Sequence, residues 1–277
     1  MYYRTSRTSP RRGGAGCSGR LIMAGVIALV SLVSYFGSRQ DNAVTGETQY
    51  IGITVEQEIA LGLQAAPQMA EEFGGLDPDQ QAQAAVDQVG NSIVQSSAAG
   101  STPYEYEFHL LEDDQTINAF ALPGGQVFIT RALFDKLQTE GELAGVLGHE
   151  IGHVVARHSA EHIAKAELTQ GLTGAAVLAT YDPDNPASAS TAQVAALIGQ
   201  LINLKFGRDD ELEADFLGVC FMNDTGYDPN ELIGVMQILE ASQQGNQPPE
   251  FFSTHPDPGN RIQRIQQAIQ NLGSCPG

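Results

Sequence analysis

The sequence predicts an α+β fold that is mostly helical, with a small β-sheet directly before one buried helix. Helical periodicity and N-capping signals recur along the chain from residue 51 onward. Short segments rich in β-branched and aromatic residues gather between residues 104 and 130. An apolar stretch, Gly141–His162, follows them and carries the most informative motif of the chain.

The first fifty residues are predicted to be an appendage to the main domain. Residues 1–20 are basic and rich in Gly and Ser, which predicts disorder, and residues 21–37 contain an uncharged apolar run. No clear small-residue cleavage site follows that run, so we predict an uncleaved signal anchor. The arginines before it place the N-terminus in the cytoplasm and the body on the periplasmic side of the cell membrane. A cleaved signal peptide and a periplasmic body are the alternative.

Residues 38–50 are predicted to be a polar linker, and residues 51–277 a single domain. Thr54 and Gln57 form a capping-box pattern that starts the first helix of this domain, and Pro123–Gly125 has the composition of a hairpin turn. The predicted helices cover about 56–73, 79–97, 166–180, 190–206, 208–223, 230–243 and 258–272, with the helix of the apolar stretch between the second and the third. The predicted strands cover 104–111, 117–122 and 126–130.

The charge distribution bears on the partners of the chain. The net charge is −19, and six of the 14 Lys and Arg residues precede Asp41, the first acidic residue. The body is therefore strongly acidic, which argues against a nucleic-acid partner and suits the solubility of an exported domain. Cys220 and Cys275 could pair outside the cytoplasm or remain two buried thiols, and the sequence leaves both open.

The motif at the centre of the apolar stretch is His149-Glu150-x-x-His153. Residues four apart lie on the same face of a helix, so both imidazoles can bind one zinc ion. Glu150 lies beside them, where it can act as the general base on a zinc-bound water. Thr139 and Glu142 form a second capping-box pattern, which predicts where this helix begins.

A catalytic zinc requires a third protein ligand, and the best candidate is Glu211 in the segment RDDELEAD. Asp215 shares its helix face and would accept the free N–H of a zinc-bound imidazole, that of His149. The alternative is a solvated acidic helix start. His158 and His162 are predicted to be surface residues, because a continuous helix would turn them away from His149.

His255 is a second candidate for the site and lies in the loop segment FFSTHPDPGNRI. It could stabilise an oxyanion, or occupy the open zinc position and hold the site inactive. A loop histidine without a role is the alternative.

Several segments together resemble a known family. HEIGH followed by RDDELEADFLG, with NAFALPGGQVFIT before and STHPDPGNRI after, resembles the HtpX/BepA/Oma-type zinc metallopeptidases, relatives of the CAAX prenyl proteases. The resemblance implies a zincin-like fold of the gluzincin kind, with His149, His153 and Glu211 as ligands of one zinc ion and Glu150 as base. Asp215 matches the aspartate of the family, and His255 lies in a matching segment. With one apolar anchor, the chain is similar to the single-anchor or periplasmic members.

The expected function is that of an endopeptidase. The resemblance implies hydrolysis of peptide bonds in unfolded or damaged membrane and envelope proteins, through a zinc-activated water with Glu150 as general base. The alternative is a chaperone or assembly factor whose zinc site is plugged, for which His255 is the candidate plug. Expected partners are protein substrates and the membrane that holds the anchor.

Overall fold

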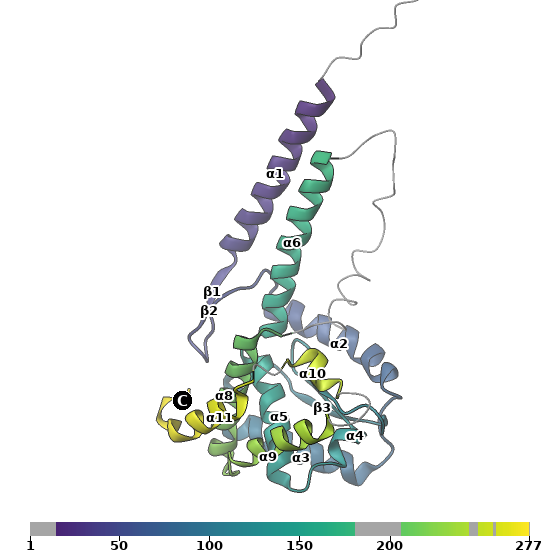
Figure 1. Ribbon diagram of the computed structural model, residues 1–277, viewed down its shortest axis with the longest axis vertical. Helices are drawn as coiled ribbons and strands as arrows, with labels where there is room; N and C mark the ends of the chain where they lie inside the picture. The colour runs from purple at the N-terminus through teal and green to yellow at the C-terminus, as the bar shows by residue number, and fades with distance from the viewer. Residues whose placement is uncertain (1–14, 181–205, 244–248, 257–258, 277) are drawn as a thin grey trace, which may run out of the picture.

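The structure is a computed structural model that describes residues 15–180, 206–243, 249–256 and 259–276 (Figure 1). The helix expected at 190–206 lies almost wholly outside these residues, as does most of the basic N-terminus. Within them the chain is mostly helical with two small sheets, which confirms the predicted class.

The elements follow one another in an order close to the predicted one. They are α1 (Ala15–Gly37), β1 (Arg39–Asp41), β2 (Thr48–Tyr50), α2 (Val55–Glu72), α3 (Gln80–Ser96), β3 (Glu107–Leu111), β4 (Ala119–Ala121), β5 (Gln126–Thr130), α4 (Arg131–Phe134), α5 (Glu140–Val155), α6 (His158–Thr180), α8 (Arg208–Thr225), α9 (Glu231–Ser242), α10 (Phe251–Thr254) and α11 (Arg261–Gln270), with short 3₁₀ helices at Ala98–Ser101 and Leu272–Ser274. The first two strands of the domain are shorter than expected, and α10 lies where a loop is predicted.

The larger sheet has three strands in the order β3-β5-β4. The central strand β5 pairs parallel with β3 and antiparallel with β4, so β4 is an edge strand. The predicted hairpin turn between β4 and β5 is present, with φ of 84° at Gly124 and 108° at Gly125. A Cβ on Gly124 would lie 2.5 Å from the Cα of Ile59, so glycine lets this turn pack against α2.

Helix α5 is the central element of the core, and every residue from Glu142 to Val155 is buried. It packs against α8 through small residues, and a Cβ on Gly218 of α8 would lie 3.2 Å from the backbone N of His149. A Cβ on Gly152 would lie 3.0 Å from the carbonyl oxygen of Ala214. Glycine at these contacts lets the two helix backbones approach closely, and this brings the motif of α5 and the acidic start of α8 together.

The N-terminus of α5 follows the prediction in part. The Thr139 side chain accepts a hydrogen bond from the N–H of Glu142 at 3.0 Å, as a capping box requires. The Glu142 carboxylate accepts a hydrogen bond from the N–H of Gln138, whereas a capping box would use the N–H of Thr139.

The predicted linker, residues 38–50, contains a β-hairpin that contacts the end of α5. Strands β1 and β2 pair antiparallel, and the side chains of Asn42 and Gln49 are buried. Asn42 Nδ2 donates to the carbonyl of Val155 at 2.8 Å, and Gln49 Nε2 donates to that of Ala156. The hairpin thus satisfies carbonyls that the end of a helix leaves without partners.

Helices α1 and α6 run side by side and project from the rest of the domain (Figure 1). Within the described residues, Gly19–Gly37 of α1 is the one helical segment long and apolar enough to cross a membrane, with a mean hydropathy of 1.8. Large apolar side chains such as Ile22 and Val33 are exposed along it. A Cβ on Gly171 of α6 would lie 2.0 Å from Ser31 Oγ, so glycine permits the close contact between the two helices.

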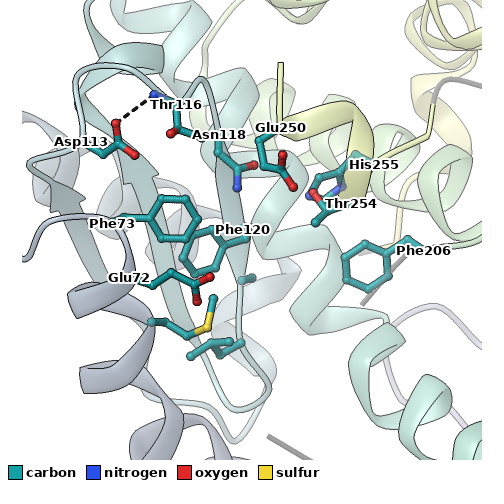
Figure 2. A pocket seen from close by; sticks show the side chains of 13 residues that line it. Glu72, Phe73, Asp113, Thr116, Asn118, Phe120, Phe206, Glu250, Thr254 and His255 are labelled. Carbon is teal, nitrogen blue, oxygen red and sulfur yellow. Dashed lines mark hydrogen bonds between the residues drawn. The ribbon is translucent and has the colours of Figure 1, made fainter. Parts of the chain in front are cut away.

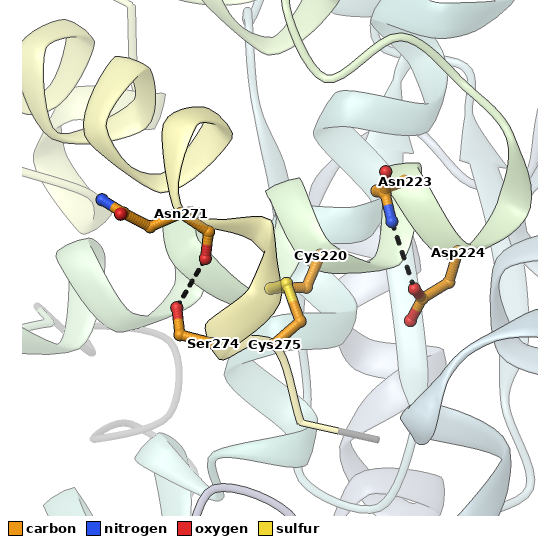
Figure 3. Close-up of a disulfide and its surroundings, with 6 residues drawn as sticks. All are labelled: Cys220, Asn223, Asp224, Asn271, Ser274 and Cys275. Atoms are coloured by element: carbon orange, nitrogen blue, oxygen red, sulfur yellow. Dashed lines mark hydrogen bonds between the residues drawn. A yellow bond between two sulfur atoms is a disulfide. The ribbon is translucent and has the colours of Figure 1, made fainter.

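A disulfide bond joins Cys220 in α8 to Cys275 near the C-terminus (Figure 3). The bond decides between the two alternatives that the sequence left open for these cysteines. It closes a loop with a sequence separation of 55 residues, which contains α9, α10 and α11.

Candidate metal centre

Four buried side chains form a cluster that could hold a metal ion: His149, His153, Glu211 and His255. One donor atom from each lies within 4.8 Å of those of the others. The two α5 histidines stand one helical turn apart, Glu211 comes from the first turn of α8, and His255 directly follows α10. The three ligands expected from the sequence therefore meet in the fold, and His255 joins them.

The chemistry of these residues fits a zinc ion. Imidazole nitrogens and a carboxylate oxygen are the donors that zinc binds in catalytic sites. Both carboxylate oxygens of Glu150 are buried without a hydrogen-bond donor among the described residues, and Nε2 of His255 is buried without a hydrogen-bond partner among them. Buried polar atoms without partners are costly, so a bound ion and its water would supply what these atoms lack.

Glu150 lies beside the cluster, with its Oε1 3.7 Å from Nε2 of His255, and is completely buried. Burial raises the pKa of its carboxyl group above the ordinary value, and the nearby Glu211 carboxylate adds to this effect. His255 and His149 act in the opposite direction. A carboxylate with a raised pKa is the better proton acceptor, which suits a general base.

The orientation of His149 is set by a pair of buried charges behind it. Nδ1 of His149 lies 2.9 Å from Oδ1 of Asp215, which leaves Nε2 facing the cluster. Arg261 donates to the two oxygens of Asp215 at 2.8 and 2.7 Å. Burial alone would raise the pKa of Asp215, but Arg261 and His149 lower it below its ordinary value.

Arg261 is a site residue that the sequence analysis missed. Its side chain is 2% exposed, and its NH1 atom lies 3.0 Å from Oε2 of Glu211. It lies in the STHPDPGNRI segment, but nothing local in that segment shows that the arginine is buried. Arg261 and Asp215 are 46 residues apart along the chain, so a local sequence pattern does not reveal their contact.

The prediction that His158 lies on the surface is wrong. His158 is 1% exposed, and its Nδ1 lies 2.9 Å from Nδ1 of His153, while its Nε2 lies 3.2 Å from Glu213. Helix α5 ends at Val155 and α6 begins at His158, so a rotation counted along one helix does not apply. Arg157 at the break has a φ of 58°, in the left-handed region.

The surface prediction for His162 also fails in part. His162 is half-buried, and its Nε2 lies 2.7 Å from Oδ2 of Asp210 at the start of α8. Burial alone would raise the pKa of Asp210, but the bond from His162 and the nearby His158 hold it below the ordinary value. This pair lies beside the cluster without forming part of it.

We expect the substitution His158→Asn to weaken zinc binding about 10–100-fold, because partners that orient a ligating imidazole have effects of this size. The loss would leave the outer nitrogen of His153 without the partner that it has at 2.9 Å. Competition with a chromophoric chelator measures the affinity. His162→Asn, on the same helix, is the matched control and should keep the wild-type affinity. Unchanged affinity in His158→Asn would show that His158 only fills space.

A cavity of about 260 Å³ adjoins the cluster, and His255 belongs to both (Figure 2). Its walls come from α2, the edge strand β4 and α10. The cluster thus adjoins a hollow that lies along the edge strand β4.

Fold and site together define an HExxH metallopeptidase, in which two histidines and a glutamate of a buried helix face a glutamate of a second helix. Residues 80–269 match the model of Peptidase family M48. The chain belongs to this family, which confirms the resemblance seen in the sequence.

Relatives from several organisms are similar to most of the chain. The Beta-barrel assembly-enhancing protease of Yersinia pestis is 33% identical over 235 residues, which cover 81% of this chain and 46% of that protein. The Mitochondrial metalloendopeptidase OMA1 of Schizosaccharomyces pombe is 30% identical over 238 residues, which cover 85% of this chain and 68% of that protein. The Metalloprotease YcaL of Escherichia coli is 29% identical over 181 residues, which cover 65% of this chain and 66% of that protein. The chain thus spans less than half the length of the Yersinia relative.

Proposed function

We propose that this chain is a zinc-dependent endopeptidase that hydrolyses unfolded or damaged proteins of a membrane or envelope. The observation that carries the proposal is the fully buried Glu150, whose oxygens have no hydrogen-bond donor among the described residues and which lies beside the cluster of possible metal ligands. The names of the similar proteins describe proteases, which supports a proteolytic activity.

In the proposed mechanism, His149, His153 and Glu211 would hold a zinc ion, which would supply Lewis acidity to a water and to the peptide carbonyl. Glu150 takes the proton of the attacking water and returns it to the leaving amine. Asp215 keeps Nδ1 of His149 protonated, so that Nε2 is free to act as a ligand.

The edge strand β4 gives the proposed substrate a place to bind. Since β5 is the one strand that pairs with β4 in the part of the chain that the structure describes, an extended peptide can add to the other side of β4 through main-chain hydrogen bonds. Binding of this kind depends little on the side chains of the peptide, and it requires an unfolded segment. Both features support unfolded or damaged proteins as substrates.

We further propose that α1 anchors the chain in a membrane with the domain on the extracytoplasmic side. The exposed apolar surface of α1 supports the anchor, and the arginines before it support the orientation. The Cys220–Cys275 disulfide supports an oxidising compartment for the domain. A periplasmic domain released by signal cleavage is the alternative.

The position of His255 supports a second candidate function, a chaperone or assembly factor with a latent site. His255 is fully buried, and its Nδ1 lies 3.0 Å from Oε1 of Glu211. In this alternative, His255 takes the ligand position that catalysis leaves to water.

We expect removal of zinc by a chelator to abolish cleavage of an unfolded protein such as reduced casein, and added zinc to restore it. The experiment uses the full chain in detergent, and gel analysis measures the cleavage rate. Cleavage that survives full removal of metal would contradict the proposal. Zinc-loaded wild type without activity, together with an active His255→Ala variant, would indicate a latent protease. Inactivity of both with zinc bound would favour the chaperone.

A further inference from the structure

The cavity beside His255 has an apolar interior suited to a single large side chain. Met69, Phe120 and Leu122 line it and are each at least nine-tenths buried. Phe73 packs on Phe120 with their ring centroids 5.3 Å apart, and both rings face the hollow in Figure 2. A volume of about 260 Å³ accommodates one side chain rather than a drug-sized ligand.

Three carboxylates from separate segments surround this apolar interior: Glu72 at the end of α2, Asp113 after β3, and Glu250 before α10 (Figure 2). Asp113 accepts hydrogen bonds from the backbone N–H groups of Gln115 and Thr116. Glu72 and Glu250 are exposed at the rim. No Lys or Arg is found among the described residues that line the cavity, so a cation from outside would meet these charges directly.

An unpaired buried amide in the same wall indicates that a ligand with a hydrogen-bond donor belongs there. Asn118 is 2% exposed, lines the cavity, and its Oδ1 accepts no hydrogen bond within the described structure. Figure 2 shows its amide group between Glu250 and Phe120, facing the hollow. A buried acceptor without a donor is unfavourable, and a bound N–H group would remove that cost.

We propose that this cavity binds a long cationic side chain, Arg or Lys, of the substrate. The methylene stem lies along Phe73 and Phe120, whose ring faces also attract the cation. The charged head group reaches Glu72 or Glu250 at the rim, and Asn118 Oδ1 accepts an N–H of the bound residue. The inference rests on the proposed function, because His255 lines the cavity, belongs to the cluster and lies 3.7 Å from Oε1 of Glu150. The enzyme would thus select cleavage sites near basic residues.

The test is a binding experiment that needs no turnover. Fluorescent peptides of Ala, Ser and Gly carry one central residue, either Lys, its uncharged analogue norleucine, or Glu, and bind to the zinc-loaded full-length Glu150→Gln variant. We expect anisotropy to show binding of the Lys peptide about fivefold tighter than the norleucine peptide, with the Glu peptide weakest. In the added double variant Glu72→Gln/Glu250→Gln, the preference for Lys should disappear. Glu71→Gln changes an exposed acid of α2 outside the cavity and should keep it.

Equal affinity for Lys and norleucine would overturn the inference, because the cavity would then be an apolar pocket only. A preference for Lys that persists in the double variant would overturn it as well, since the general acidity of the protein would be the cause. Casein cleavage by wild type is measured separately. A preference for Lys that depends on the cavity acids, without casein cleavage by wild type or by His255→Ala, would refute the proposed function and leave the binding pocket in place.

Discussion

The substitution Glu150→Gln is expected to lower kcat for an unfolded protein substrate by about 10²–10⁴-fold, while the chain keeps its zinc. Glutamine has nearly the same shape as glutamate, so the buried position remains filled. The amide cannot accept a proton from water, and this function is the one assigned to Glu150. Initial cleavage rates, together with the zinc content of the same preparation, measure the effect.

The matched control for this prediction is Glu140→Gln on the same helix. Glu140 is exposed and bonds to the hydroxyl of Tyr227, so its replacement should leave kcat within about twofold. Full activity of the Glu150→Gln variant would mean that another group accepts the proton. Loss of zinc from the variant would instead show that Glu150 contributes to binding the metal.

The substitution Arg261→Leu is expected to lower the free energy of unfolding of the metal-free protein by about 3–5 kcal/mol. Arg261 donates two hydrogen bonds to Asp215 and lies 3.0 Å from Glu211, and all three side chains are buried. Its loss leaves two carboxylates inside the protein without their shared cation. Chemical denaturation of the chelator-treated protein measures the change.

Two further variants determine the origin of the effect. Arg264→Leu removes an exposed arginine of the same helix, and we expect a change within about 0.5 kcal/mol. Adding Asp215→Asn to Arg261→Leu should recover part of the stability, because the double variant no longer buries that unpaired charge. If Arg261→Leu unfolds like wild type, solvent or another group compensates the carboxylates.

The features that depend on local sequence were predictable. The motif helix follows from its capping residue Thr139 and its apolar run, and the spacing of His149 and His153 places them on one face. The placement of Glu211 required an additional argument, that zinc needs a third ligand. The structure shows why α8 reaches that position, since glycines on both helices let it pack closely on α5.

The contacts that were missed join residues far apart in sequence. His158 was misplaced because the break at Arg157 has neither glycine nor proline to mark it. The positive φ of Arg157 is offset by an ion pair with the buried Glu58, which lies 99 residues earlier in the chain. Asn42 and Val155 are likewise 113 residues apart, so the role of the hairpin could not be read from its polar composition.

The hairpin of residues 38–50 has a mechanical consequence. It follows α1 directly, and it bonds the end of α5 through Asn42 and through Gln40, which accepts from Arg157 at 3.2 Å. A flexible linker would let the domain rotate freely relative to α1. The hydrogen-bonded hairpin instead couples the orientation of α1 to that of α5, the helix that carries His149 and His153. With α1 in a bilayer, as proposed, the cavity beside His255 would keep a fixed distance and orientation relative to the lipid surface.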